Sequence, residues 1–182
     1  FPESHAASFA LIVYASAYLR HYYAPEFLAA MLNAQPMGFY SAGTLVEDAK
    51  RHGVRVRAVD VTRSAWDHTI ECADGTVVVP HDGVIAVHAP ASASVGTGHS
   101  LRKALGPLRG PAAALLRERP APPSVRLGLR SIRGLGAHAR GKLERALTGG
   151  PFTSIRDFVA RSGLDQRALR FIAESGAFDA FV

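Results

Sequence analysis

Two glycines separated by a leucine, Gly134-Leu135-Gly136, stand directly before a predicted helix that begins at Ala137. Glycine permits positive φ and lets another backbone come close. The amide N–H groups at the start of a helix have no partner within it and lie at the positive end of its dipole, so they suit a phosphate oxygen. Three basic residues add positive charge around this turn: Arg133, Arg140 and Lys142. The spacing therefore predicts a turn that binds phosphate groups.

This turn has no side chain placed to reach the edge of a base, so we expect DNA binding that is independent of sequence and sensitive to salt. The simpler interpretation is an ordinary helix turn in which glycine serves as a cap. Apolar residues around the turn match a helix-hairpin-helix pattern: Ile132, Ala139, Leu143 and Ala146. A weaker second unit follows, with helices at 155–160 and 166–174 joined by a turn at 162–164. Both interpretations of the first turn stay open at this point.

A second candidate site lies near the start of the chain, where Ser4 and His5 precede a dense apolar run. A hydroxyl, an imidazole and free amides at a helix N-terminus could bind the triphosphate of a nucleotide. The alternative is a helix that Ser4 caps, with a histidine whose hydrogen bonds are satisfied within the protein. Glu3 argues against a phosphate partner because it carries the same sign of charge.

The remaining polar residues predict no catalytic centre and no metal site. Four histidines are scattered without the spacing of metal ligands, and we expect them at the surface: His68, His81, His88 and His99. Asp60 and Asp67 lack a third acidic partner, so turn caps are the simpler interpretation than a two-metal site. The sequence contains no P-loop, dinucleotide fingerprint or Ser/His/Asp set.

Composition narrows the class of protein further. The net charge of the 182 residues is +6, and five of these six excess charges fall in residues 123–182, which carry ten basic and five acidic side chains. This asymmetry favours a polyanion as the partner of the C-terminal part. The single cysteine, Cys72, excludes an internal disulfide, and the apolar run at 6–19 is too short to span a membrane. We therefore expect a cytoplasmic protein, and the first residues read as part of a longer polypeptide.

The pattern of apolar residues predicts a mainly α fold with a few short strands (α+β). The first helix, from Ser4 to Leu19, is apolar almost all round, so we expect it to be buried on most sides. Two further helices are predicted at 25–32 and 45–52, the latter capped by Ser41. Short strands are predicted at 54–59, 66–70, 76–79 and 125–129. Residues 80–124 are rich in proline, glycine and serine, and only 112–118 predicts a helix there.

Taken together, these segments resemble the bacterial C-family DNA polymerases, the relatives of the polymerase III alpha subunit, and specifically their error-prone, damage-inducible branch. The resemblance begins with the opening stretch Phe1-Pro-Glu-Ser-His-Ala-Ala-Ser-Phe-Ala10. It continues through Ala29 to Tyr40, Asp48 to Gly53, Ser64 to Asp67, Arg126 to Leu129 and Ser175 to Asp179. Order and spacing agree over residues 1–72 and 124–182, whereas residues 73–123 depart from the family.

The resemblance implies three parts: residues 1–72 as the end of the polymerase fingers region, 73–123 as an irregular linker or insertion, and 124–182 as a helix-hairpin-helix module. It implies duplex primer-template DNA and an incoming deoxynucleotide as partners, and it extends to translesion synthesis and DNA repair. A sliding clamp and accessory mutagenesis proteins are expectations of the same kind. The metal-binding aspartates of the family lie upstream of the matched region. The parent polymerase would therefore use Mg²⁺, and this segment would be inactive alone.

Two alternatives to the polymerase interpretation remain. One is a stand-alone helix-hairpin-helix DNA-binding protein, in which the N-terminal helices serve only as a support. The other is a non-functional remnant of a polymerase.

Overall fold

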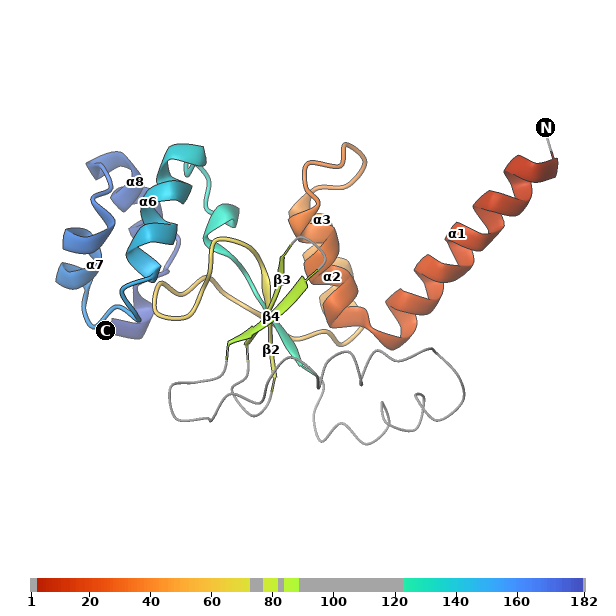
Figure 1. Ribbon diagram of the computed structural model, residues 1–182, viewed down its shortest axis with the longest axis horizontal. Helices are drawn as coiled ribbons and strands as arrows, with labels where there is room; N and C mark the ends of the chain where they lie inside the picture. Colours follow the sequence, from red (N-terminus) through yellow and green to blue (C-terminus); the bar gives the residue numbers. More distant parts are fainter. Residues whose placement is uncertain (1–2, 73–76, 82–83, 89–122, 182) are drawn as a thin grey trace.

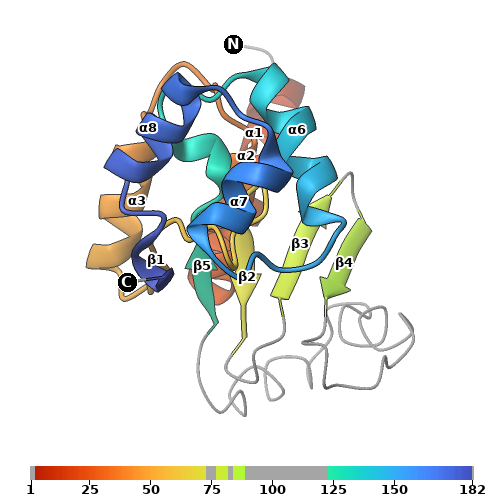
Figure 2. The ribbon, with the colours of Figure 1, turned by 90° about the vertical axis from the view of Figure 1, so that its left-hand side faces the viewer.

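Five short strands form a sheet that lies between two groups of helices (Figure 1). The computed structural model describes residues 3–72, 77–81, 84–88 and 123–181. The strands are β1 (Val56–Arg57), β2 (Thr69–Glu71), β3 (Val77–His81), β4 (Val84–His88) and β5 (Ser124–Arg126). Their order across the sheet is β1-β5-β2-β3-β4, with β5 parallel to β1 and antiparallel to β2 (Figure 2).

The sheet contains strands from all three of the parts predicted from the sequence, residues 1–72, 73–123 and 124–182. Strand β5 belongs to the predicted C-terminal module, yet it pairs with β1 and β2 from the N-terminal part. Strand β4 corrects the expectation of irregular structure after residue 80, since Val78 of β3 pairs with Val87 of β4. The run from Val84 to Val87 is rich in β-branched residues, which favour a strand. The predicted helix at 112–118 lies outside the described residues, and the division at 72 and 123 stays a prediction.

Helices α2 (Ala24–Asn33) and α3 (Ala42–Arg51) confirm their predictions. Pro25 lies in the first turn of α2, where its missing N–H costs nothing. The Ser41 hydroxyl accepts a hydrogen bond from the Thr44 amide at 3.1 Å and caps α3. Leu28 and Leu32 of α2 are buried against β2 and β5 of the sheet, so these helices form a small core with it.

Helix α1 (Glu3–Tyr22) differs from its prediction. None of its residues is buried, and the side chain of Tyr14 is 70% exposed. The helix extends away from the sheet and contacts the other helices at its C-terminal end, where Arg20 pairs with Asp48 at 2.7 Å (Figure 1). The expected burial fails because, within the described part of the chain, nothing covers the rest of its apolar surface.

The C-terminal half consists of η1 (Leu129–Ser131), α6 (Ala137–Leu147), α7 (Ile155–Ser162), α8 (Gln166–Glu174) and η2 (Asp179–Phe181). The boundaries of α7 and α8 confirm the predicted second helical unit. These helices share one core around Leu143, Phe158 and Ile172, all of which are fully buried. Val61 and Trp66, from the connection between β1 and β2, belong to the same core and join the helices to the sheet.

A buried ion pair crosses from β5 to β2. The Arg126 guanidinium donates to both oxygens of Glu71, from Nε at 2.9 Å and from Nη2 at 3.0 Å. Its third group, Nη1, donates to the Ala58 carbonyl at 2.8 Å. Both side chains are less than a tenth exposed, so this fork fixes the strand that leads directly into the C-terminal helices.

His68 corrects the expectation of a surface histidine. Its side chain is buried, and Nδ1 accepts a hydrogen bond from the Gly128 amide at 3.2 Å. Burial, and next the charge of Arg130, lower the pKa of His68 to about 4, so the ring is neutral near pH 7. Asn33 of α2 exchanges two hydrogen bonds with the backbone of His68. The side chains of His81, His88 and His99 lie outside the described part.

Candidate nucleic-acid interface

Two turns of similar design face one another in the C-terminal half. We call residues 132–136, between η1 and α6, the first hairpin, and residues 162–165, between α7 and α8, the second hairpin. Each contains a glycine with positive φ, Gly134 at +87° and Gly163 at +55°. A half-buried leucine follows each glycine, and both leucines pack against the shared core. The two hairpins are therefore held in a fixed arrangement by the same apolar cluster.

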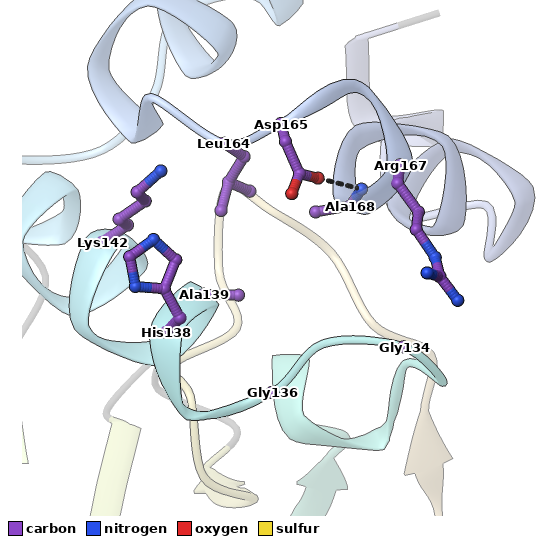
Figure 3. A pocket seen from close by; sticks show the side chains of 9 residues that line it. All are labelled: Gly134, Gly136, His138, Ala139, Lys142, Leu164, Asp165, Arg167 and Ala168. Atoms are coloured by element: carbon purple, nitrogen blue, oxygen red, sulfur yellow. Dashed lines mark hydrogen bonds between the residues drawn. The ribbon is translucent and has the colours of Figure 1, made fainter.

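A pocket of about 340 Å³ lies where the two hairpins meet (Figure 3). Gly134, Gly136, His138 and Lys142 line it from the first hairpin and α6. On the opposite side it is lined by residues of the second hairpin and α8, among them Asp165 and Arg167. The structure thus brings three of the predicted phosphate-binding residues, Gly134, Gly136 and Lys142, to one place.

The two glycines of the first hairpin serve different purposes. Gly134 has positive φ, and a Cβ atom there would lie 2.3 Å from the ring of Phe171, so the fold itself requires glycine. Gly136 has φ −101° and ψ −174°, which any residue can adopt, and a Cβ atom there would meet no atom within 4 Å. Its missing side chain therefore leaves open space at the surface, where another molecule can approach the backbone.

The amides beside this open space are available to a ligand. Gly136 is the N-cap of α6 and has no side chain with which to satisfy them. The first hydrogen bond of the helix runs from the Arg140 amide to the Gly136 carbonyl at 3.1 Å. The amides of Ala137, His138 and Ala139 precede it and find no carbonyl within α6. They lie at the positive end of the helix dipole, which favours an anion.

The three predicted basic residues occupy different positions. Arg133 is exposed beside Gly134 and makes no hydrogen bond or ion pair with the described residues. Arg140 pairs with Glu144 at 2.8 Å on the surface of α6. Lys142 donates from Nζ to the carbonyl of Gly163 at 2.7 Å, which links α6 to the second hairpin. Of the three, Lys142 alone lines the pocket.

Sequence reasoning missed two pocket residues whose side chains can donate hydrogen bonds to a phosphate, His138 and Arg167. His138 is exposed in the first turn of α6 and projects into the pocket (Figure 3). Arg167 is exposed in the first turn of α8, and its guanidinium lies over the ring of Phe171, 5.7 Å from its centroid. The signal was present in the sequence, because each residue stands four positions after the glycine of its hairpin.

The second hairpin differs from the first in one charge. Asp165 is the N-cap of α8, and its Oδ1 accepts a hydrogen bond from the Ala168 amide at 2.8 Å (Figure 3). The N-cap position of α8 therefore carries a carboxylate, whereas the equivalent position of α6, Gly136, has no side chain and is open. Because this carboxylate satisfies an amide and repels anions, the first hairpin is the better candidate of the two for a phosphate.

Part of the positive charge of the C-terminal third serves the fold. Arg126 pairs with Glu71, and Arg130 pairs with Asp67 at 2.8 Å. Arg161 donates to three carbonyls, those of Ala146, Gly150 and Pro151, and ties α7 to the end of α6. The charge excess that the sequence shows is therefore larger than the charge available to a partner.

Ser4 and His5 lie at the beginning of α1, far along the chain and in space from the hairpins (Figure 1). The helix begins at Glu3, so Ser4 lies inside the first turn and is not the cap that the sequence predicted. The acidic Glu3 suits this end of the dipole. Ser8 donates to the Ser4 carbonyl at 2.9 Å, and the His5 ring contacts the Phe9 ring edge-on. Nucleotide binding by Ser4 and His5 stays a prediction.

The described residues contain no group of three or more His, Cys, Asp and Glu side chains that could hold a metal ion. Asp60 instead accepts hydrogen bonds from the Thr62 amide and hydroxyl, which confirms its predicted role in a turn. None of the described helices is long and apolar enough to cross a membrane.

The geometry of two glycine hairpins has a counterpart among known families. The family described as helix-hairpin-helix motif matches residues 53–182 of this chain. The chain therefore belongs to the helix-hairpin-helix family. The match begins before β1 and includes the strands, so it covers more than the hairpins themselves.

Curated proteins that resemble the chain over nearly its whole length are error-prone DNA polymerases. The polymerase of Burkholderia mallei (strain ATCC 23344) is 38% identical over 98% of this chain and 13% of the relative. The polymerase of Azoarcus sp. (strain BH72) is 40% identical over 99% of this chain and 13% of the relative. The polymerase of Anaeromyxobacter dehalogenans (strain 2CP-C) is 42% identical over 97% of this chain and 12% of the relative. These matches confirm the polymerase resemblance that the sequence motifs indicated.

The chain spans about an eighth of the length of these relatives. The similarity also covers residues 73–123, where we expected a departure from the family, since it extends over 178 of the 182 residues in the Burkholderia protein.

Proposed function

We propose that this chain is the segment of an error-prone DNA polymerase that holds duplex primer-template DNA, without reading its sequence, while another part of the polypeptide carries out the chemistry. The observation that carries the proposal is the open N-terminus of α6 at Gly136, with Lys142, His138 and Arg167 around one pocket. Backbone amides and cations bind phosphates and have no means of distinguishing bases there.

The similarity to polymerases favours this proposal over a stand-alone DNA-binding protein. It extends through α1, α2 and α3, which lie before the helix-hairpin-helix match at residue 53. A support for the hairpins alone would have no reason to keep a polymerase-like sequence in these helices. Roles in translesion synthesis and repair, a cytoplasmic location, and contacts with a sliding clamp or accessory mutagenesis proteins belong to the proposal through the resemblance.

Nucleotide binding by Ser4 and His5 is a further part of the proposal, supported by their place in the first turn of α1. Magnesium is assigned to the parent polymerase. Among the described residues of this chain, no cluster of acidic side chains could hold such an ion, so the proposed role of this chain involves no metal.

Gly136→Val tests the phosphate-binding role. Valine suits the extended backbone at this position and meets no neighbouring atom, so the protein should stay folded, with a small loss of stability because valine is a poorer N-cap than glycine. Its methyl groups would block the approach of a phosphate to the amides. Loss of hydrogen bonds to a charged group costs about 1.5–3 kcal/mol, so the affinity for a blunt duplex should fall about tenfold to a hundredfold. Fluorescence anisotropy at fixed salt measures it.

Gly141→Val is the matched control, because it adds the same side chain to α6 at a position that is also open but lies a turn further along the helix. Thermal melts should first show that both variants are folded. The affinity of Gly141→Val for the duplex should then match that of the wild type. The loss in Gly136→Val should be equal for duplexes rich in A·T and in G·C. Wild-type affinity in Gly136→Val would rule out the first hairpin as a phosphate site.

Asp165→Asn should strengthen duplex binding. Asparagine still caps α8, but it removes the negative charge that faces the pocket. A charge at a helix terminus is worth about 0.3–1 kcal/mol at low salt, so the affinity should rise about two- to fivefold. Glu174→Gln, which removes one negative charge at the opposite end of α8, should leave the affinity unchanged. An equal gain in both variants would mean that only net charge matters.

A further inference from the structure

The connection between α2 and α3 exposes two large aromatic side chains. Phe39 is 91% exposed and Tyr40 is 60% exposed, at the tip of a segment that we call the aromatic loop, residues 36–40. Phenylalanine is among the residues most often buried in folded proteins, so these two adjacent exposed rings form a small apolar surface that is open to contact with another molecule. No charged residue lies within the loop.

The aromatic loop is held in shape by its own hydrogen bonds. The side chain of Gln35 accepts from the Met37 amide and donates to the Tyr40 carbonyl, both at 3.2 Å. The Ser41 hydroxyl then caps α3 directly after the loop. These hydrogen bonds join the two ends of the loop, so the two aromatic residues belong to a closed turn with a defined conformation.

One arginine connects this loop to the first hairpin. Arg130 of η1 donates to the carbonyls of Asn33 at 3.0 Å and Gln35 at 3.1 Å, and it pairs with Asp67. Arg130 stands four residues before Gly134. The aromatic loop and the start of α6 also lie at the same upper edge of the molecule in both views (Figures 1 and 2). A DNA ligand that followed this edge from the first hairpin would reach the loop.

We propose that Phe39 and Tyr40 stack on an unpaired nucleobase of the DNA whose duplex part is bound by the first hairpin, an inference that rests on the proposed function. Aromatic side chains stack on any base, which adds affinity without adding sequence preference. The uncharged loop supplies no phosphate contact, so it complements the hairpin, which supplies amides and cations. The two surfaces together suit the junction between duplex and single strand.

The test compares a blunt DNA duplex with the same duplex carrying a single-stranded overhang, using the full 182-residue chain. The wild type should bind the overhang DNA about fivefold or more tightly than the blunt duplex, and the Phe39→Ala/Tyr40→Ala double variant should bind both equally. 2-Aminopurine placed at successive overhang positions should lose fluorescence at the stacked position in the wild type only. Tyr14→Ala, which removes an exposed aromatic from α1, is the matched control and should behave as the wild type.

The two hypotheses fail separately. If the double variant keeps the preference for the overhang and the same 2-aminopurine signal, or if the wild type shows no such preference, the stacking role is overturned. A protein surface, from another part of the polypeptide or from a separate partner, would then be the occupant to test. If Gly136→Val binds the blunt duplex as tightly as the wild type, the phosphate site of the proposed function fails. A wild-type chain that binds neither DNA contradicts both.

Discussion

Arg126→Met is expected to lower the free energy of unfolding by about 3–5 kcal/mol, because it leaves the buried Glu71 carboxylate without its main partner. Both oxygens of Glu71 accept from Arg126, and desolvation makes an unpaired charge at this place costly. Arg57 also approaches Glu71, at 3.2 Å, but its side chain is half exposed and replaces the lost fork only in part. Urea denaturation followed by circular dichroism measures the change.

Two further variants define the cause of this loss. Arg170→Met removes an arginine from an exposed pair with Glu174 on α8, and it should change the stability by less than about 0.5 kcal/mol. Replacing both buried partners, with Arg126→Met and Glu71→Leu together, should recover much of the stability, since no charge is then left unpaired. An Arg126→Met protein as stable as Arg170→Met would show that the buried pair contributes nothing to the fold.

Gly128→Ala is expected to destabilise the protein by about 3 kcal/mol, at the upper end of overpacking costs. A Cβ atom on Gly128 would lie 2.4 Å from the Trp66 carbonyl oxygen and from the backbone of Asp67, and backbone atoms cannot move aside as a side chain can. Its φ of −80° is ordinary, so the cost is steric alone. The same displacement would also strain the bond from the Gly128 amide to His68.

Gly141→Ala, the same substitution at another glycine, is expected to raise the stability instead of lowering it. Gly141 lies within α6 and a Cβ atom there would meet nothing within 4 Å, so alanine should stabilise the helix by about 0.5–1 kcal/mol. The midpoints of urea unfolding should move in opposite directions, with equal slopes for the two variants. Midpoints that fall together would contradict the steric argument for Gly128.

The elements that could be predicted from the sequence are those specified by neighbouring residues. The Ser41 cap of α3, Pro25 in the first turn of α2, and the glycine turns before α6 and α8 depend on short-range geometry, and all are present. The polymerase resemblance could also be drawn from short motifs in their correct order, and the relatives confirm it.

The features that could not be predicted depend on residues far apart in the chain. His68 was expected at the surface, but Asn33 and Gly128, 35 residues before it and 60 after it, enclose it. Arg126 and Arg130 contributed to the apparent charge excess, yet their partners are Glu71 and Asp67 in another part of the sequence. The spacing within the first hairpin likewise could not separate Gly134, which packs on Phe171, from Gly136, which faces open space.

Because β5 lies between β1 and β2, the N-terminal and C-terminal parts of the chain depend on one another for a complete sheet. A protein shortened to begin at residue 124 would carry a strand with both edges unpaired, and the piece left behind would lose the strand that separates β1 from β2. Open strand edges of this kind promote self-association. We therefore expect the C-terminal helices and the helices that precede the sheet to unfold in one cooperative transition.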